Sequence, residues 1–441
     1  SQTAAIDSVS IDGGGLFLQG TILALSFVAL LLFTQKDHFT AQASALPGSV
    51  EESEATTSGV EMTEIYPLVL FSISGMLLFP IAHDLITLFV ALEVLSIPLY
   101  IITGLARRRR LLSQEAALKY FLLGAYSSAF FLFGGAFLYG FSGSLSLGTI
   151  RTAAATPGAN HVFLLIGVVF VSVGLLFKVG AVPFHSWTPD VYQGAPTPVT
   201  GFMAACTKVA AFGAMFRIFI VGFGSIANDW RPTLVSISIA TMVGGAVAAI
   251  SQRDVKRTLA FSSITHAGFL LLGVISLTKV GFTSMLFYLV AYGFATVGAF
   301  GIVTLVRDST GEVNDLNRWA GLAKKSPAVA IAFSLFLLSF GGIPLTAGFI
   351  AKFSIFSAAY VGGQTALVVV GVISSAIALF FYLRVILIMF FKEPTDDTVT
   401  VEVPSLLVGS AITICFIVTL VLGVYPNLLF NFANTMTTLV P

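Results

Sequence analysis

The chain alternates between long apolar runs and short polar connections over nearly its whole length. An apolar run of about 17 to 25 residues is long enough for a helix to cross the hydrocarbon core of a bilayer. By this criterion the sequence predicts an all-α polytopic membrane protein with about twelve transmembrane helices. These helices are predicted at residues 15–33, 64–82, 85–105, 117–141, 161–178, 198–223, 232–251, 258–277, 280–306, 327–360, 365–391 and 404–424.

Two of the predicted helices are interrupted by glycine and proline, the fifth at Gly180–Phe184 and the tenth at Gly341–Leu345. Each is the fourth helix in a run of five. Because five is odd, the second run enters the membrane upside down relative to the first, which predicts two inverted five-helix repeats, each with a broken helix. Such repeats place ion sites near the membrane midplane. We therefore divide the chain into a first helix with a cytoplasmic acidic loop, a first repeat, a second inverted repeat, and a C-terminal helix with its tail, at residues 1–63, 64–223, 224–391 and 392–441.

The distribution of lysine and arginine predicts the orientation. One set of loops carries most of the basic residues: Lys36, Arg107, Arg108, Arg109, Arg110, Arg253, Lys256, Arg257, Arg307, Arg318, Lys324, Lys325 and Lys392. The opposite loops carry Arg151, Arg231 and Lys279. The positive-inside rule puts the first set in the cytoplasm. A multi-pass protein of the cell membrane with both termini outside is the expected topology.

Composition supports the membrane assignment and excludes several kinds of chemistry. The chain is 56% hydrophobic and 10% charged, with a mean hydropathy of +0.96, outside the range of soluble domains. Cys206 and Cys415 lie in apolar runs with no partner at metal-ligand spacing, so neither a disulfide nor a metal site is predicted. We find no phosphate loop, iron–sulfur motif or dinucleotide fingerprint. No cofactor is expected in this chain.

Ionisable residues inside the predicted helices are the main candidates for function, because a charge at the bilayer centre costs about 2.5 to 3.5 kcal/mol on insertion scales. Four lie well inside, Glu93, Lys178, Lys208 and Lys352, and His266 is a fifth candidate. Burial disfavours an ammonium and a nearby carboxylate favours it, so a Glu93–Lys178 pair of changing separation could load and release a proton. The alternative is a static ion pair that sets helix register. Three lysines against one carboxylate leave unpaired charge, which favours proton transfer.

The polar and aromatic residues around the first break have several possible roles. His185 could relay protons or could cap the broken backbone, and the sequence leaves both open. His266 is flanked by hydroxyl residues, which help to hold a file of water. Trp187 and Asp190 lie in the proline-rich connector, where we expect an interface anchor and a turn or helix-start acceptor, respectively.

Four segments resemble a known family. They are LFVALEVLSIPLY around Glu93, FKVGAVPFHSWTPDVYQGAPTPVT from Phe177, DVKRTLAFSSITHAGF from Asp254 and GGIPLTAGFIAKF from Gly341. These motifs resemble those of the antiporter-like membrane subunits of the proton-pumping NADH:quinone oxidoreductase, respiratory complex I. Subunits of this kind are shared with multisubunit sodium/proton antiporters. The resemblance covers residues 64–391.

Within that family the chain is most similar to the N-type subunits. Lys352 occupies the position where an M-type subunit is expected to carry glutamate, and L-type subunits are expected to continue into a long lateral helix. Family members usually have fourteen spans and this sequence shows twelve, so the resemblance implies two leading helices that are absent or not included here.

The resemblance implies a subunit that moves protons from the cytoplasm to the outside, driven by quinone reduction in other subunits. It implies that Glu93 tunes Lys178, the central switching base, that Lys208 and His266 form a connecting axis, and that Lys352 donates toward the exit. NADH, FMN, iron–sulfur clusters and quinone are expected in other subunits. The expected partners are neighbouring antiporter-like and small membrane subunits and lipid, with no nucleic acid.

Two other functions remain open from the sequence. The first is a subunit of a multisubunit sodium(cation)/proton antiporter, which has the same fold and lysines but no electron-transfer partner. The second is a structural membrane anchor whose lysines are vestigial ion pairs.

Overall fold

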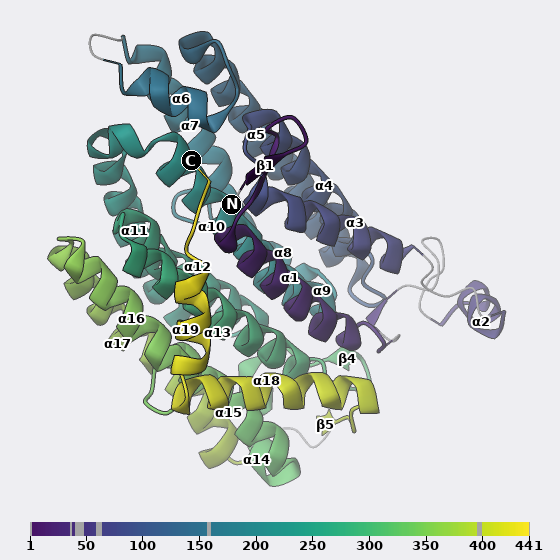
Figure 1. The fold of residues 1–441 in the computed structure, drawn as a ribbon. Coiled ribbons are helices and arrows are strands. Elements are labelled where there is room, and N and C mark those ends of the chain that lie inside the picture. Colours follow the sequence, from purple (N-terminus) through teal and green to yellow (C-terminus); the bar gives the residue numbers. More distant parts are fainter. Residues whose placement is uncertain are drawn as a thin grey trace.

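The computed structural model describes residues 2–35, 38–39, 48–58, 64–156, 160–394 and 399–440, which form a bundle of helices (Figure 1). Within these ranges ten helical segments are long and apolar enough to cross a membrane. They are α1 (Gly13–Leu32), α4 (Leu85–Thr103), α5 (Arg110–Ser142), α7 (Val162–Val179), the run Thr197–Gly222, the run Gly224–Ile250, α12 (Val255–Ile275), α13 (Lys279–Val303), α17 (Thr365–Phe391) and α18 (Leu406–Val424). The prediction of an all-α polytopic membrane protein is confirmed.

Two of the twelve predicted segments contain shorter apolar helices. The second is α3 (Ile65–Leu78), which continues into η2 (Phe79–Ile81), and the tenth divides into α15 (Pro327–Gly341) and α16 (Ala347–Val361). The other ten coincide with the ten long segments. The run Thr197–Gly222 is built from α9 (Thr197–Phe202), η3 (Met203–Thr207), α10 (Lys208–Arg217) and η4 (Ile218–Gly222), and the run Gly224–Ile250 from η5 (Gly224–Ile226) and α11 (Ala227–Ile250).

Short elements connect these helices. The remaining helices are α2 (Val50–Thr57), α6 (Leu147–Ala154), α8 (Trp187–Gly194), η6 (Leu316–Trp319), α14 (Leu322–Lys325) and α19 (Asn427–Thr435). At the end with the chain termini, β1 (Gln2–Ala4) pairs antiparallel with β2 (Val9–Ile11); at the other end β3 (Val306–Asp308) lies between β4 (Gly311–Glu312) and β5 (Thr400–Val401). The predicted acidic loop contains α2, while Lys36 and Glu61 lie outside the described residues.

The helices are interrupted at both positions that the sequence predicted. α7 ends at Gly180 and α15 at Gly342, with φ of +74° and +80°. After each glycine, the next backbone N–H donates to a carbonyl of the preceding turn, at 2.9 Å and 3.0 Å. This is a Schellman cap, which favours glycine because residues with a Cβ rarely adopt the left-handed conformation. The two breaks therefore have the same local cause.

Backbone contacts also recur in the two halves of the chain. Asp84 caps the start of α4, and Asp254 caps the start of α12, each through a side-chain oxygen. The residues next to each aspartate pair with a connecting segment further along the chain, 145–147 in the first half and 314–316 in the second. The same local contacts thus occur in both halves of the chain.

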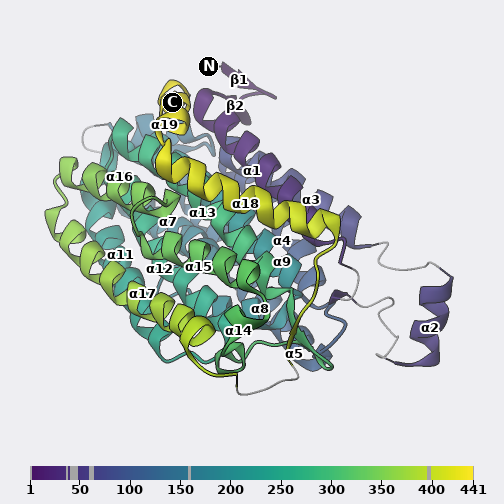
Figure 2. The ribbon, with the colours of Figure 1, turned by 90° about the horizontal axis from the view of Figure 1, so that it is seen from below.

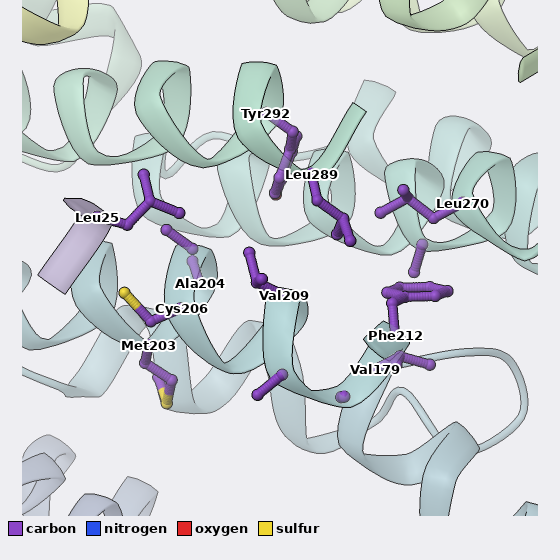
Figure 3. Packing of buried hydrophobic residues seen from close by; sticks show 14 of the residues in the cluster. Leu25, Val179, Met203, Ala204, Cys206, Val209, Phe212, Leu270, Leu289 and Tyr292 are labelled. Atoms are coloured by element: carbon purple, nitrogen blue, oxygen red, sulfur yellow. The ribbon is translucent and has the colours of Figure 1, made fainter. Parts of the chain in front are cut away.

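The core lies around α10, α12 and α13, whose side chains are buried nearly all round. Figure 3 shows Val209 and Phe212 facing Leu289 and Leu270 across this core. α17 and α18 lie at the periphery and expose apolar residues such as Phe380 (Figure 2). An outer surface of this kind suits contact with lipid chains or with other apolar helices. The charged residues of the core are consequently kept away from lipid.

Candidate proton-transfer axis

Lys178 lies in the last turn of α7, next to the first break, and is 5% exposed. Its ammonium Nζ donates to Ser96 Oγ at 2.8 Å and to Tyr120 OH at 3.4 Å. Ser96 lies on α4, one turn after Glu93, whose Oε1 is buried without a hydrogen-bond partner. No ion pair joins Glu93 to Lys178 in the described part of the chain. The structure thus brings the two residues to neighbouring helices, with a serine hydroxyl as the direct partner of the lysine.

Aromatic residues hold the break against Lys178. Tyr120 of α5 stacks on Trp187 of α8, with ring centroids 4.7 Å apart and planes at 7°. The indole Nε1 of Trp187 donates to the Phe177 carbonyl at 2.9 Å, and its side chain is 3% exposed. The prediction of Trp187 as an interface anchor is therefore wrong. Its amphipathic ring satisfies a backbone group at the break instead of meeting the membrane surface.

Lys208 is the first residue of α10 and follows the π-helical turn η3. Such turns often occur at functional sites, because they displace the following side chains from the regular helical positions. Lys208 Nζ donates to the carbonyl and to the hydroxyl of Ser263, at 2.6 Å and 2.8 Å. The same hydroxyl lies 3.3 Å from Tyr192 OH of α8. A chain of contacts Tyr120, Trp187, Tyr192 and Ser263 consequently runs from the surroundings of Lys178 to Lys208.

His266 lies in the middle of α12 and is 3% exposed. Its Nδ1 is 2.7 Å from Tyr288 OH and its Nε2 is 3.4 Å from Tyr382 OH. Tyr292 lies between His266 and Lys208, since the imidazole centroid is 4.9 Å from the tyrosine ring and Lys208 Nζ is 5.2 Å from it. A small cavity of about 10 Å³ beside the imidazole has about the space of one water. Tyrosine hydroxyls can donate or accept, so they suit either tautomer of the ring.

Lys352 lies on α16, after the second break, and is 4% exposed. Its Nζ donates to Ser375 Oγ at 2.7 Å and to the Gly341 carbonyl at 3.1 Å, so the lysine satisfies backbone that the break has freed. Phe269 of α12 separates it from His266, with Nζ 5.0 Å from the ring centroid. Lys352 is therefore held by the second broken helix. We call the series Glu93, Lys178, Lys208, His266 and Lys352 the axis.

The three lysines share one feature that decides what the axis can do. Their direct partners are hydroxyls and backbone carbonyls, and no carboxylate forms an ion pair with them among the residues described. A hydroxyl can accept from an ammonium and donate to a neutral amine. Each site can thus hold the lysine in either protonation state without losing its hydrogen bond.

His185 is not connected to this axis by a hydrogen bond in the described structure. It is half-buried in the segment between α7 and α8, and its Nδ1 is buried without a partner. The structure connects Glu93, Lys178, Lys208, His266 and Lys352 through shared neighbours, and leaves His185 beside them.

Asp190 was predicted to be a turn or helix-start acceptor, and it does lie in the first turn of α8, but its carboxylate contacts side chains of other helices. Its carboxylate forms ion pairs with Lys119 of α5 at 2.8 Å and with Arg257 of α12 at 2.7 Å. It therefore links three helices and both halves of the chain. The sequence did not show this because the partners lie more than sixty residues away on either side.

Sequence reasoning also missed a buried pair at the end where the termini lie. Arg217 of α10 and Asp12, which caps α1, are 2.8 Å apart and almost fully buried. Asp12 also accepts from the backbone N–H groups of Gly15 and Val440. The available signal was an arginine inside an apolar run, the same criterion that selected the lysines.

The sequence model of the family described as "NADH:quinone oxidoreductase/Mrp antiporter, TM" matches residues 82–378. The NADH-quinone oxidoreductase subunit N of Rhodococcus opacus is 56% identical over 95% of this chain and 82% of its own length. That of Mycobacterium tuberculosis is 51% identical over 98% of this chain and 86% of its own length.

One solved structure gives the same result, and a second shows the shared fold. A chain of respiratory complex I from Thermus thermophilus with bound aureothin has a TM-score of 0.80 and 32% identity, over 98% of this chain and 89% of that one. A chain of the Mrp complex from Dietzia sp. has a TM-score of 0.83 at 22% identity, covers 97% of this chain and 84% of its own, and shows the shared fold. The chain therefore belongs to the subunit N family of the NADH-quinone oxidoreductases, the antiporter-like membrane subunits of respiratory complex I.

Proposed function

We propose that this chain moves protons from the cytoplasm to the outside along Glu93, Lys178, Lys208, His266 and Lys352, driven by quinone reduction in other subunits. The observation that carries the proposal is the set of three buried lysines whose partners are hydroxyls and carbonyls. A structural anchor would pair such charges permanently, because an unpaired buried charge is expensive. Groups held ready for either protonation state suit a proton carrier.

In this proposal each residue has a separate part. Glu93 tunes Lys178 through the electrostatic field across Ser96, since no ion pair fixes them together. Lys178 is the switching base, Lys208 and His266 pass the proton on past Tyr292, and Lys352 releases it. His185 stays a weaker candidate for a relay, supported by its position in the first break and by its unpartnered Nδ1.

We further propose twelve crossings, two inverted repeats at residues 64–223 and 224–391, and both termini outside, in the cell membrane. The recurring caps and pairings support the repeats, and a matched arginine adds to them. Arg217 donates to the carbonyl four residues before Asp84, and Arg384 to the carbonyl four residues before Asp254. In an inverted repeat these matched contacts lie on opposite sides of the membrane.

The proposed partners are neighbouring antiporter-like and small membrane subunits, with lipid on the remaining surface. NADH, FMN, iron–sulfur clusters and quinone are assigned to other subunits of the complex. A cation/proton antiporter subunit is the second candidate, because the matched family model covers both kinds of complex. Copurification of this chain with iron–sulfur proteins from native membranes separates them.

Replacing Lys352 by methionine is the test that separates proton transfer from a structural role. Methionine keeps much of the side-chain volume and removes the amine. We expect NADH-driven acidification of inverted membrane vesicles to fall by at least about tenfold, because a positioned acid–base group contributes about 10²- to 10⁴-fold. The exposed Lys392, changed to methionine in the same strain background, is the matched control and is expected to pump normally.

Acidification and NADH:quinone reductase rate are measured on the same vesicles, with the amount of assembled complex determined in parallel. A normal pumping rate in fully assembled Lys352→Met complex would contradict the proposal and favour the anchor.

Ser96→Ala tests the partner of Lys178. A hydrogen bond to a charged group contributes about 1.5–3 kcal/mol, and about 1.4 kcal/mol corresponds to a tenfold change in an equilibrium, so we expect acidification to fall about tenfold. Ser72→Ala is the control, because the Ser72 hydroxyl is equally buried and donates to the Leu95 carbonyl, not to a lysine. Equal effects of the two changes would show that only loss of a buried hydroxyl matters.

A further inference from the structure

A second polar site lies at the end of the molecule that carries β3, β4 and β5. It is a pocket of about 60 Å³ between the start of α12, the segment between α8 and α9, and the β3–β4 hairpin. Its lining includes His38, Arg109, Thr197, Lys256, Glu312 and Asn314. The proposed topology places this end at the cytoplasmic side.

The pocket has a paired acid and base in its wall. His38 Nδ1 lies 2.8 Å from Glu312 Oε1, and the hydroxyl of Thr197 donates to Glu312 Oε2 at 2.6 Å. The backbone at His38 is fixed, because its carbonyl accepts from Arg107 N at 3.0 Å and the next residue pairs with Ala106. The imidazole is therefore held between the pocket and a carboxylate.

Three buried polar atoms of the pocket residues have no hydrogen-bond partner. They are Nε2 of His38, Oδ1 of Asn314 and Oε1 of Glu312. His38 and Asn314 are 7% and 5% exposed. Buried polar groups are normally hydrogen-bonded to protein or to ordered water. A pocket of about 60 Å³ has room for a few waters, so water is the natural partner of these atoms.

The pocket is close to the axis along α12. Lys256 lies seven residues before Ser263, two turns away on the same face, or about 10 Å along the helix. Lys256 Nζ donates to the Ala195 carbonyl at 2.6 Å, and Ser263 is the partner of Lys208. Tyr192, which contacts the Ser263 hydroxyl, precedes Gln193 of the pocket wall. The same two segments thus connect the pocket floor to Lys208.

The charges around His38 and Glu312 affect the protonation of the carboxylate. Arg108, Arg109, Lys256 and Arg307 line the pocket, and Asp254 lies at the start of α12. Burial raises the pKa of Glu312, but His38, Lys256 and the Thr197 hydroxyl outweigh it and lower the pKa to about 2. With His38 protonated, Glu312 is therefore ionised at neutral pH.

We propose that His38 is the proton-loading group at the cytoplasmic mouth of the axis, with Glu312 as its fixed counter-ion. The imidazole takes a proton from bulk water at the pocket and releases one to pocket water on the side of Lys256, from where it reaches Lys208. This inference rests on the proposed function, because it supplies protons to the same axis.

His38→Gln is the test in whole complex I in inverted membrane vesicles. Glutamine still offers a donor to Glu312 but cannot titrate. We expect NADH-driven acidification to fall by about threefold or more at pH 8.5, where protons are scarce, and by less than about twofold at pH 6. Glu312→Gln is expected to lower the rate across the whole pH range, because the imidazolium loses its counter-ion. Lys324→Gln, which removes an exposed ion pair with Glu393, is the control and keeps the unmutated pH profile.

The outcomes are distinguishable when Lys178→Ala is measured beside these variants. A His38→Gln complex that is fully assembled and keeps the unmutated pH profile, while Lys178→Ala stops pumping, overturns the loading group but not the axis. Rates lowered equally at all pH values in His38→Gln show a structural role and also overturn it. Normal pumping by the Lys178→Ala complex contradicts the proposed function itself.

Discussion

Lys178→Ala is expected to abolish NADH-driven acidification and to depress the NADH:quinone reductase rate in native membranes. The change removes the amine that Ser96 and Tyr120 hold beside the first break, and alanine leaves no group there that can take a proton. A positioned acid–base group contributes about 10²- to 10⁴-fold, so acidification should fall below about 5% of the unmutated rate. Because quinone reduction is coupled to proton movement, the reductase rate falls as well.

Both rates are measured on the same vesicles, with Lys392→Ala as the matched control on an exposed lysine. If acidification and reductase activity both stay at the unmutated level while the complex is assembled, this chain does not carry protons for complex I. Loss of acidification with a normal reductase rate would separate this subunit's protons from electron transfer, and it would contradict the coupled form of the proposal.

Arg217→Met is expected to destabilise the chain by about 3–5 kcal/mol, the cost of removing one partner of a buried ion pair. Arg217 and Asp12 are almost fully buried, and the change leaves the Asp12 carboxylate without its cation. Asp12 also holds the N-terminus of α1 and the backbone of Val440, so the loss loosens both chain ends. The amount of assembled complex and its thermal unfolding temperature are the measurements.

A second substitution distinguishes charge from packing. Asp12→Asn combined with Arg217→Met removes the unpaired charge and keeps an oxygen acceptor for Gly15. We expect the double variant to recover part of the stability that Arg217→Met loses. Equal instability of the single and double variants would show that the arginine acts through packing and through its bond to Pro80 rather than through its charge.

The apolar pattern was sufficient for the helices, because a helix that faces lipid must satisfy its own backbone and therefore needs an uninterrupted apolar run of fixed length. The same reasoning located both breaks, since Gly180 and Gly342 adopt a conformation that glycine favours. It also selected Glu93, Lys178, Lys208, His266 and Lys352, because charge in an apolar run is costly wherever the helix packs. These are local properties, which one stretch of chain expresses by itself.

The sequence could not predict the contact partners of these residues, because the partners come from helices far apart in the chain. An expected Glu93–Lys178 pair became a lysine held by Ser96 and Tyr120, and the aromatic Trp187 turned inward to the break. Spacing along the chain does not report which side chains meet across a bundle, and a serine or tyrosine carries no charge to draw attention to it.

The sequence by itself therefore determined that this protein crosses the membrane many times, where its helices break, and which residues bring charge into it. The tertiary structure alone decided that the three buried lysines are held by hydroxyls and carbonyls, that Asp190 joins both halves, and that His38 meets Glu312 over a polar pocket. The physical reason is that the cost of burying a charge is set by the residue and its apolar neighbours in sequence. The contacts that offset this cost are set by packing between distant helices.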